Sequence, residues 1–470
     1  MKKRARGSEK RDRQGLKPIR SAGGTARGPR GAPPRADTKP AHSKDSAAPL
    51  QLVQIEKPVY GGAFLARVEG KAVFVPLTLK GERARVRVVE EKRGYATAEV
   101  EEIIAAAAER VVPACGHFGA CGGCQYQHAE YKTQLAYKQA ILHETLERGG
   151  VRAPEEMAVL AGEPWAYRNR IRVAFDAEGR AGYRGRRSHA VTRMKECPIA
   201  APLLVRAALA AGEIAHEMPS RLRPSEMALF CDAAETALLA SVTVADGGKG
   251  RFDDFARALA ERIPETRGVE LVAAGGEGRE PRNVAQWGTS SLLYSAGGFE
   301  YRVDQGAFFQ VNRWLLGGLV DCATGGRHGG LAWDLFAGVG LFARRLAEAF
   351  DRVVAVESAP AATAPLKHNL CGTRATAVKA ATLEFLRGVR NSERPDVIVV
   401  DPPRIGLGAE TTALLGEIAA PSLTYVSCDP ATLTRDLRGL LGAGYSIERV
   451  TLADLFPQTF HLETVVELRR

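Results

Sequence analysis

Short alternating runs of apolar and polar residues, broken by glycines, fill residues 50–104. The period of two predicts five β-strands, at residues 52–55, 63–68, 71–75, 84–90 and 96–103. Glycine-containing turns follow at residues 60–62 and 69–71. Five short strands in a segment of this length indicate a small β-barrel of the OB type.

After residue 302 the pattern changes to alternating strands and helices, which is typical of an α/β fold. Apolar runs predict strands at residues 331–336, 352–356, 397–400 and 423–426, and helices at residues 341–350 and 431–441. Gly338, Glu357, Asp401 and Cys428 each follow one of these strands. Ligands of open α/β sheets bind at the carboxyl ends of the strands, so we expect these residues to meet at one site.

The middle of the chain is less informative. A helix is predicted over residues 131–148, and basic strands over residues 167–175 and 182–187. These strands interleave cationic and aromatic side chains, as an RNA-facing surface would. The residues are Trp165, Tyr167, Arg168, Arg170, Arg172, Tyr183, Arg184, Arg186 and Arg187. An ordinary solvated sheet edge explains them equally well.

The positive charge of the chain is concentrated at its start. Residues 1–50 contain 14 Lys and Arg against 4 Asp and Glu, a net charge of +10, whereas the whole chain has a net charge of +11. Because residues 1–48 have almost no bulky apolar side chains, we expect a disordered basic tail that either binds phosphates loosely or has no partner. We therefore divide the chain into this tail, a barrel at 49–108, a central domain at 109–300 and an α/β domain at 301–470.

The location is inferred from what the sequence lacks. The charged start is not followed by an apolar segment of the secretory kind, and no apolar run approaches the roughly 18 residues of a membrane span. We expect a monomer in the reducing cytoplasm, where clustered cysteines bind metal or do chemistry more often than they form disulfides.

Three cysteines lie within ten residues, interleaved with glycines, and a fourth precedes a proline. They are Cys115, Cys121, Cys124 and Cys197. Glycines allow one loop to wrap a soft metal centre, and four thiolates suit either zinc or an iron–sulfur cluster. The spacing alone does not separate these two. Four unrelated buried cysteines are the less favoured alternative, and His117 is either a further ligand or a solvated loop residue.

Cys428 is a candidate nucleophile because it lies on a predicted turn from strand to helix. Asp429 is suited to the N-cap position and Pro430 to the first helical position, so the helix begins directly behind the sulfur. The positive end of the helix dipole would favour the thiolate. Glu463, beside a terminal β-like run at residues 464–468, is a candidate general base. The competing interpretation is a buried structural cysteine.

The glycines of the first α/β turn indicate a nucleotide-like ligand. Gly338 and Gly340 allow the backbone to approach it, and Glu357 is placed to bind two ribose hydroxyls. The same residues fit a dinucleotide such as NAD, but hydride transfer has no use for a nucleophilic cysteine on a later strand. S-adenosylmethionine (SAM) needs the same ribose-binding carboxylate without a pyrophosphate cradle.

Two resemblances cover residues 50–470. Residues 60–63, 74–77 and 81–82, with Arg85 and Arg87, make the barrel resemble a TRAM domain, an RNA-binding module. Residues 50–470 as a whole resemble the RNA uracil-C5 methyltransferase family, in particular its 23S rRNA branch. The motifs that carry this resemblance lie at residues 308–312, 334–340, 356–357, 401–404, 427–433 and 461–463. Only the basic tail lies outside.

The resemblance to this family implies roles for individual residues. Cys428 would be the nucleophile and Glu463 the general base. Phe336, Glu357 and Asp401 would contact SAM, and Gln310 either SAM or the target base. The four cysteines would hold a [4Fe-4S] cluster with a structural or RNA-positioning role. Ala337 and Leu341 stand where relatives commonly have Cys and Asn, which puts fine cofactor contacts in doubt.

The chemistry that the resemblance implies starts with addition of the Cys428 thiolate to C6 of uracil. This addition makes C5 nucleophilic enough to take the methyl group of SAM. Glu463 would then remove the C5 proton, and elimination of Cys428 would release 5-methyluridine. The base must be unpaired or flipped to reach the sulfur.

Four other functions are weighed against this one. A tRNA uracil-C5 methyltransferase shares the catalytic residues, although tRNA-specific bacterial members resemble only the catalytic part. A radical-SAM methylthiotransferase has a different cysteine spacing and a C-terminal TRAM domain. An amino-methyltransferase would leave Cys428 and Glu463 without a role. A catalytically silent RNA-binding or ribosome-assembly protein is disfavoured by the same pair.

Overall fold

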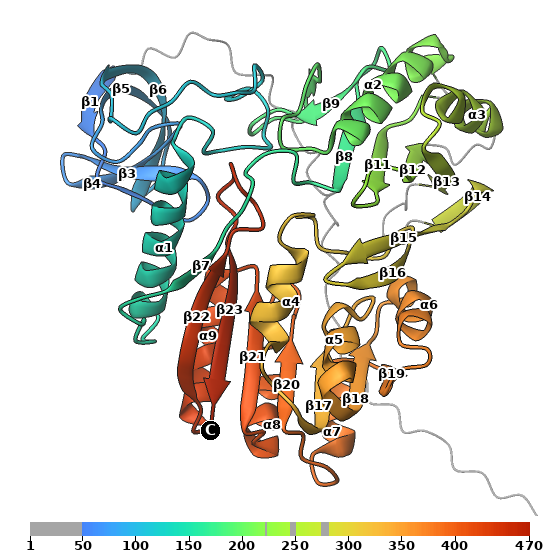
Figure 1. Cartoon of the computed structure of the whole chain (residues 1–470). Helices are drawn as coiled ribbons and strands as arrows, with labels where there is room; N and C mark the ends of the chain where they lie inside the picture. Colours follow the sequence, from blue (N-terminus) through green and yellow to red (C-terminus); the bar gives the residue numbers. More distant parts are fainter. Residues whose placement is uncertain (1–48, 221–222, 245–250, 274–281) are drawn as a thin grey trace, which may run out of the picture. The chain divides into compact units, whose positions relative to one another are not determined.

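The computed structural model describes residues 49–220, 223–244, 251–273 and 282–470 (Figure 1). The predicted basic tail at residues 1–48 lies outside these ranges. Among the described residues, no helix is both long and apolar enough to cross a membrane.

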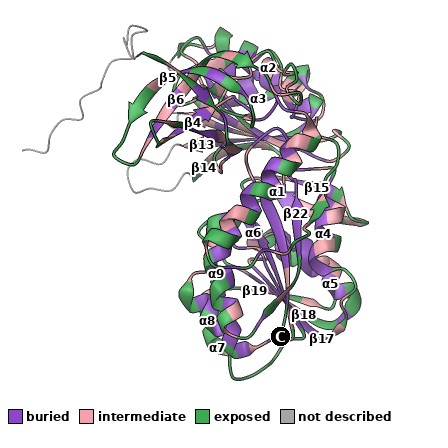
Figure 2. Ribbon diagram, turned by 90° about the vertical axis from the view of Figure 1, so that its left-hand side faces the viewer, coloured by how far each residue is buried: buried purple, intermediate pink, exposed green. Residues whose placement is uncertain are grey.

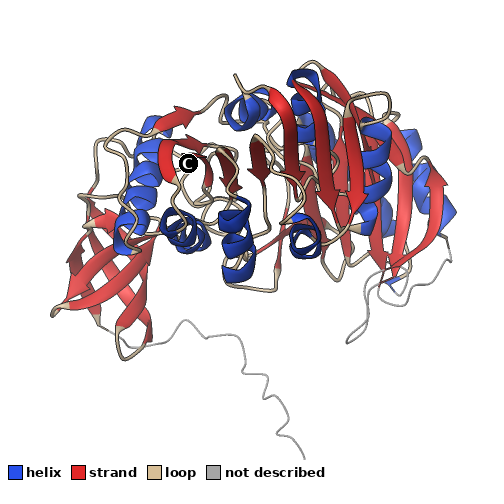
Figure 3. Cartoon of the chain, turned by 90° about the horizontal axis from the view of Figure 1, so that it is seen from below, coloured by secondary structure: helices blue, strands red, loops and turns tan. Residues whose placement is uncertain are grey.

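The first described region, up to residue 105, forms a six-stranded sheet whose strands are joined by loops, without a helix (Figure 3). Its strands, in the order β1-β5-β6-β4-β3-β2, are β1 (Leu50–Gln54), β2 (Lys57–Pro58), β3 (Ala63–Val68), β4 (Lys71–Pro76), β5 (Arg83–Glu91) and β6 (Tyr95–Ala105). The five predicted strands are confirmed. The structure adds β2, which is too short to leave an alternating pattern. Alternate residues such as Val73 and Val75 point into a shared apolar core.

The second sheet has seven strands in the order β10-β9-β8-β11-β12-β13-β14. They are β8 (Arg170–Phe175), β9 (Ala181–Arg184), β10 (Val191–Arg193), β11 (Glu226–Cys231), β12 (Leu238–Val244), β13 (Thr266–Ala273) and β14 (Arg282–Gly288). Helices α2 (Pro202–Glu217) and α3 (Phe252–Arg262) bury their apolar residues against one face of this sheet.

The third sheet carries the predicted α/β fold. Its eight strands follow the order β19-β18-β17-β20-β21-β23-β22-β7, with parallel pairing from β19 to β21. They are β7 (Ala158–Leu160), β17 (Gly329–Leu335), β18 (Phe350–Glu357), β19 (Ala375–Lys379), β20 (Val397–Val400), β21 (Ser422–Ser427), β22 (Ser446–Ala453) and β23 (Glu463–Arg469). Strand β7 comes from the middle of the chain. A separate hairpin, β15 (Ser291–Ala296) and β16 (Phe299–Asp304), spans residue 300.

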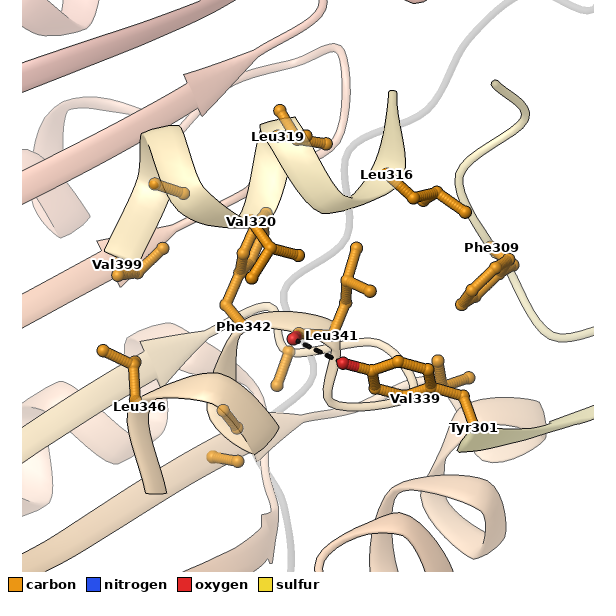
Figure 4. Close-up of a cluster of buried hydrophobic side chains, with 14 of the residues drawn as sticks. Tyr301, Phe309, Leu316, Leu319, Val320, Val339, Leu341, Phe342, Leu346 and Val399 are labelled. Carbon is orange, nitrogen blue, oxygen red and sulfur yellow. Dashed lines mark hydrogen bonds between the residues drawn. The ribbon is translucent and has the colours of Figure 1, made fainter. Parts of the chain in front are cut away.

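Helices cover both faces of the third sheet, as parallel strands require. One face packs on α4 (Leu316–Thr324), α5 (Leu341–Ala349) and α6 (Pro360–Asn369), the other on α1 (Tyr131–Arg148), α7 (Thr382–Val389), α8 (Ala409–Ile418) and α9 (Pro430–Gly442). The strands are therefore buried, while the helices expose their outer faces (Figure 2). In the first of these cores Tyr301 donates a hydrogen bond to the carbonyl oxygen of Leu341, 3.3 Å away (Figure 4).

The loop between β22 and β23, residues 454–462, is held by a distant part of the chain. Lys138 of α1 forms an ion pair with Asp454, with 2.5 Å between Nζ and Oδ1, and both side chains are 0% exposed. The same Nζ donates to the carbonyl oxygen of Phe456 at 2.9 Å. Gln134, one turn earlier, donates to the side-chain oxygen of Gln458. Helix α1 thus fixes the loop that leads into β23.

We expect Lys138→Met to lower the free energy of unfolding by about 3–5 kcal/mol, because it leaves the carboxylate of Asp454 buried and unpaired. Chemical denaturation measures the change. Lys132→Met on the same helix is the matched control, since that side chain is 81% exposed and its ion pair lies on the surface.

The double variant Lys138→Met with Asp454→Leu should regain most of the lost stability, because it removes both charges. A Lys138→Met protein as stable as the Lys132→Met control would show that the ion pair does not hold the loop.

Candidate active site

A cavity of about 740 Å³ lies at the carboxyl ends of β17, β18, β20 and β21. The structure brings almost all of the predicted catalytic and cofactor residues to its wall: Gln310, Phe336, Gly338, Glu357, Asp401, Cys428 and Glu463. Gly340 is the exception, because it does not line this cavity. It takes a φ of +92° as the N-cap of α5, and a Cβ there would come within 2.9 Å of Leu366. A glycine is needed at this position so that α5 can pack closely on Leu366 of α6.

The turn after β17 fixes the carboxylate of Glu357. One oxygen accepts a hydrogen bond from the backbone N–H of Gly338 at 2.8 Å, and the other accepts one from Ala359 at 2.6 Å. Phe336 precedes Gly338 with a φ of +63°, a strained conformation for a residue with a side chain. Each carboxylate oxygen keeps a second lone pair for a hydroxyl in the cavity.

Cys428 lies on the predicted turn, directly before α9. Asp429 is the N-cap and accepts hydrogen bonds from the backbone N–H groups of Ala431 and Thr432, as predicted. The prediction that the helix favours the thiolate is wrong. Burial raises the pKa of Cys428 to about 11, and the nearby carboxylates of Glu463 and Asp401 add to the increase. The donors of the first turn are already engaged by Asp429.

Two carboxyl groups line the same cavity as the sulfur, of which Glu463 is buried and Asp401 half-buried. Burial raises the pKa of Asp401 to about 7, although a hydrogen bond from Gln310, with 3.3 Å between Nε2 and Oδ2, opposes the change. Burial also raises the pKa of Glu463, and the charge of Asp401 raises it further, whereas Arg404 lowers it. A carboxyl group with a raised pKa is a stronger base once it has lost its proton.

Two residues of the site, His461 and Arg404, were given no role by the sequence analysis. His461 lines the cavity, and its ring centroid lies 4.3 Å from that of Phe460. Burial lowers the pKa of His461 to about 4, so the imidazole is neutral at pH 7. Arg404 approaches His461 with 3.4 Å between Nη2 and Nδ1. Both residues belong to motifs at 401–404 and 461–463 that carry the family resemblance, and this membership was the signal that could have identified them.

Tyr60 of the N-terminal sheet also lies near the catalytic residues. Its ring contacts Phe460 edge-on, with centroids 5.5 Å apart. Burial is the main reason why the pKa of Tyr60 is raised to about 12. The negative charge of Asp429 raises it further, and those of Cys428 and Glu463 do so to a smaller extent. Nothing in the local sequence announces this contact, because it joins opposite ends of the chain.

The four clustered cysteines line a second cavity, of about 260 Å³. All four are free thiols, and Cys197 accepts a hydrogen bond from the hydroxyl of Tyr183 at 3.5 Å. His117 lines the same cavity, but its Nε2 accepts a hydrogen bond from the backbone N–H of Lys195. In the described ranges no group of three or more His, Cys, Asp and Glu side chains is arranged to hold a metal ion.

The predicted cation–aromatic surface is only partly exposed. Tyr167 is buried and donates its hydroxyl to the carbonyl oxygen of Pro457 at 3.0 Å, so its place on an RNA-facing surface is wrong. Arg168 lies beside it, between the cysteine cavity and a neighbouring groove. Alternation along a strand identified both residues without showing which one faces the interior.

Comparison with known proteins agrees with this geometry. The profile of the tRNA (uracil-5-)-methyltransferase family matches residues 289–470, and that of the TRAM domain matches residues 50–100. The 23S rRNA (uracil(1939)-C(5))-methyltransferase of Chromohalobacter salexigens is 33% identical over 97% of this chain and 94% of its own. The chain belongs to the RNA uracil-C5 methyltransferase family.

Further relatives of this methyltransferase include the 23S rRNA (uracil(1939)-C(5))-methyltransferase of Halomonas elongata, 33% identical over 87% of both chains. Among solved structures, the tRNA (uracil-54, C5)-methyltransferase of Pyrococcus abyssi, in complex with S-adenosyl-L-homocysteine, matches with a TM-score of 0.72. It covers 89% of this chain and all of its own at 21% identity, which establishes the shared fold.

The pKa of Cys428 predicts how fast the free enzyme is alkylated. At pH 7 the sulfur is a thiol, and the rate should rise about tenfold per pH unit until the pKa near 11. Differential alkylation followed by mass spectrometry of the Cys428 peptide measures this profile, with the exposed Cys371 as internal reference. A rate that levels off below pH 8 would contradict the raised pKa.

Proposed function

We propose that this protein methylates C5 of a uridine in 23S rRNA, through a covalent bond between Cys428 and C6 of the base. The observation that carries the proposal is the meeting of Cys428, Asp401 and Glu463 at one cavity beside the fixed carboxylate of Glu357. Two relatives named as 23S rRNA uracil-C5 methyltransferases support the choice of RNA. When bound, SAM supplies the methyl group and the positive charge of a sulfonium.

Cys428 opens the reaction. Its sulfur bonds to C6 of uracil, and the electrons of the 5,6 double bond move toward C5 and the O4 carbonyl, so that C5 becomes a nucleophile. The thiol must first lose its proton, which passes to solvent. A positive charge in the same cavity opposes the effects of burial and of neighbouring carboxylates on the pKa of Cys428.

Glu463 completes the reaction. Once C5 carries both its original hydrogen and the new methyl group, the carboxylate removes the proton. The electrons of the C5–H bond re-form the double bond and expel the sulfur of Cys428. The burial of Glu463 suits this role, because it raises the basicity of the carboxylate and keeps bulk water away.

The remaining residues position the reactants. Gln310 donates to Asp401 and presents its amide at the cavity, where it suits the polar edge of the target base. Glu357 suits the ribose hydroxyls of the cofactor, because both of its oxygens are fixed by backbone N–H groups.

Replacing Cys428 by Ala should abolish methyl transfer and leave SAM binding within about twofold, because the sulfur acts only on the base. Replacing Glu463 by Gln should permit methyl transfer but block proton removal, so a covalent protein–RNA complex accumulates. Single-turnover assays with radiolabelled SAM and denaturing gels measure both effects. Full turnover by either variant would refute the mechanism.

RNA that contains 5-fluorouracil separates the enzyme from a silent RNA-binding protein. Fluorine at C5 cannot leave as a proton, so the wild-type protein should be trapped on the RNA in the presence of SAM. The Cys428→Ala variant is the matched control. A wild-type protein that binds this RNA without forming an adduct would support the binding-protein alternative.

The substrate is tested by mapping 5-methyluridine in 23S rRNA and tRNA from a strain that lacks the gene. We expect the loss of one 23S rRNA site that is restored by the wild-type gene. Loss confined to tRNA would favour the tRNA alternative, which the tRNA names of the family profile and of the structural relative keep open.

We also propose that Cys115, Cys121, Cys124 and Cys197 bind a [4Fe-4S] cluster. All four cysteines line one cavity, and four thiols are the donor set that such clusters use. Gly122 and Gly123 suit this loop, since a Cβ on Gly122 would come within 3.2 Å of the Arg184 carbonyl oxygen. The cluster would tie the loop at residues 115–124 to the segment before α2, in a structural role.

Protein purified without oxygen should contain about four iron atoms per chain and an equal amount of sulfide. Replacing Cys124 by Ser should lower the iron content, whereas Cys322→Ser on α4, outside the cavity, should not. One zinc and no iron in the anaerobic protein would rule out the cluster.

A further inference from the structure

The seven-stranded sheet has a second face that α2 and α3 do not cover. This face forms the floor of a groove of about 670 Å³, a volume within the range of ligand sites. Register places Arg172, Ala228, Ser241 and Glu270 side by side across β8, β11, β12 and β13, and all four line the groove. Every second residue of each strand therefore points into it.

The groove adjoins the methyl-transfer cavity. Gly306, Val311 and Ala361 line both. The motif that carries Gln310 lies between the groove and the cavity. An RNA strand that places its target base at Cys428 therefore passes close to the groove. Nothing in the proposed chemistry uses this second space.

The end of the groove at β8 carries two arginines beside Glu226. Arg170 lies with its guanidinium 4.6 Å from the ring centroid of Phe230 and donates to the carbonyl oxygen of Ala307 at 2.7 Å. Within the described ranges no carboxylate pairs with it. Arg172 follows on the same strand with its side chain 73% exposed, 3.6 Å from Glu226. Two guanidinium groups on alternate residues of one strand suit the phosphates of an RNA strand.

The end of the groove at β13 presents acceptors. Glu270 is 9% exposed and accepts hydrogen bonds from the hydroxyl of Ser241 and, at 3.0 Å, from the amide of Asn283. Gln305 donates to the carbonyl oxygen of Ala240, and its Oε1 has no hydrogen-bond partner in the part of the chain that is described. Acceptors match the exocyclic amino groups of adenine, cytosine and guanine, which uracil lacks.

We propose that this groove binds one nucleotide of the substrate RNA next to the target uridine, and that Glu270 accepts a hydrogen bond from the amino group of its base. Arg170 and Arg172 bind the adjoining phosphates. The groove thereby selects an amino-bearing base at one flanking position. The proposal rests on the proposed function for its substrate, and it assigns a sequence preference that the catalytic cavity does not provide.

The test combines Glu270→Gln with RNA substrates in which each nucleotide flanking the target is replaced, one at a time, by an abasic linker. On the parent RNA the variant should lose at least about fivefold in affinity and in kcat/KM, because the charged acceptor is gone. At one position the abasic linker should lower the affinity of the wild-type protein for the RNA and leave the affinity of the variant unchanged. Affinity for SAM should be unchanged, which shows that the variant is folded.

The matched control is Glu213→Gln on α2, which covers the opposite face and exposes 64% of this side chain. It should behave as the wild type with every RNA. Equal losses for wild type and Glu270→Gln at every abasic position would overturn the proposal, as would a control that reproduces the effect. RNA affinity is measured by fluorescence anisotropy without SAM, so an absence of methyl transfer would refute the proposed function and leave this test intact.

Discussion

The buried ion pair between Lys138 and Asp454 is the interaction on which the active site depends most. It joins residues 316 positions apart, and neither side chain reaches water. Burying two charges is costly unless they are paired and hydrogen-bonded, so the pair tolerates little displacement. Tyr167 and Gln134 add hydrogen bonds to the same loop. Glu463 begins the strand that follows this loop and pairs with Ala453 of β22, so α1 and the sheet together fix its position.

A second constraint is the concentration of carboxyl groups with raised pKa values at one edge of the sheet. Burial raises the pKa of Asp334 to about 8 and of Asp401 to about 7, and it also raises the pKa of Glu463. Such groups are unfavourable for folding at neutral pH, because the folded state binds protons that the unfolded state has released. Their presence, together with the strained φ of Phe336, is typical of a site shaped for chemistry.

Much of this site was predictable from the sequence because α/β sheets place ligands at the ends of strands. That rule located Glu357, Asp401 and Cys428 before their contacts were known. Strand alternation also predicted the strands of the N-terminal sheet, apart from the short β2. The helix N-cap at Asp429 was predictable as well, because capping depends only on neighbouring residues.

What the sequence did not reveal depends on contacts between distant segments. The pKa of Cys428 was predicted in the wrong direction, because the helix dipole is a local effect and the burial of the sulfur is not. The approach of Tyr60 to the catalytic residues and the loop held by Lys138 were likewise invisible. The groove beside the cavity arises because register aligns alternate residues of four strands, two of them far apart in the chain.

The central claim is that carbon C5 of uracil exchanges its hydrogen for a methyl group at Cys428 and Glu463. Substrate RNA that carries tritium at C5 of its uridines tests this claim most directly. With SAM, the enzyme should release one tritium to water for each methyl group transferred, and none without Cys428. Methyl transfer that releases no tritium would contradict the account, because it would place the new methyl group on another atom.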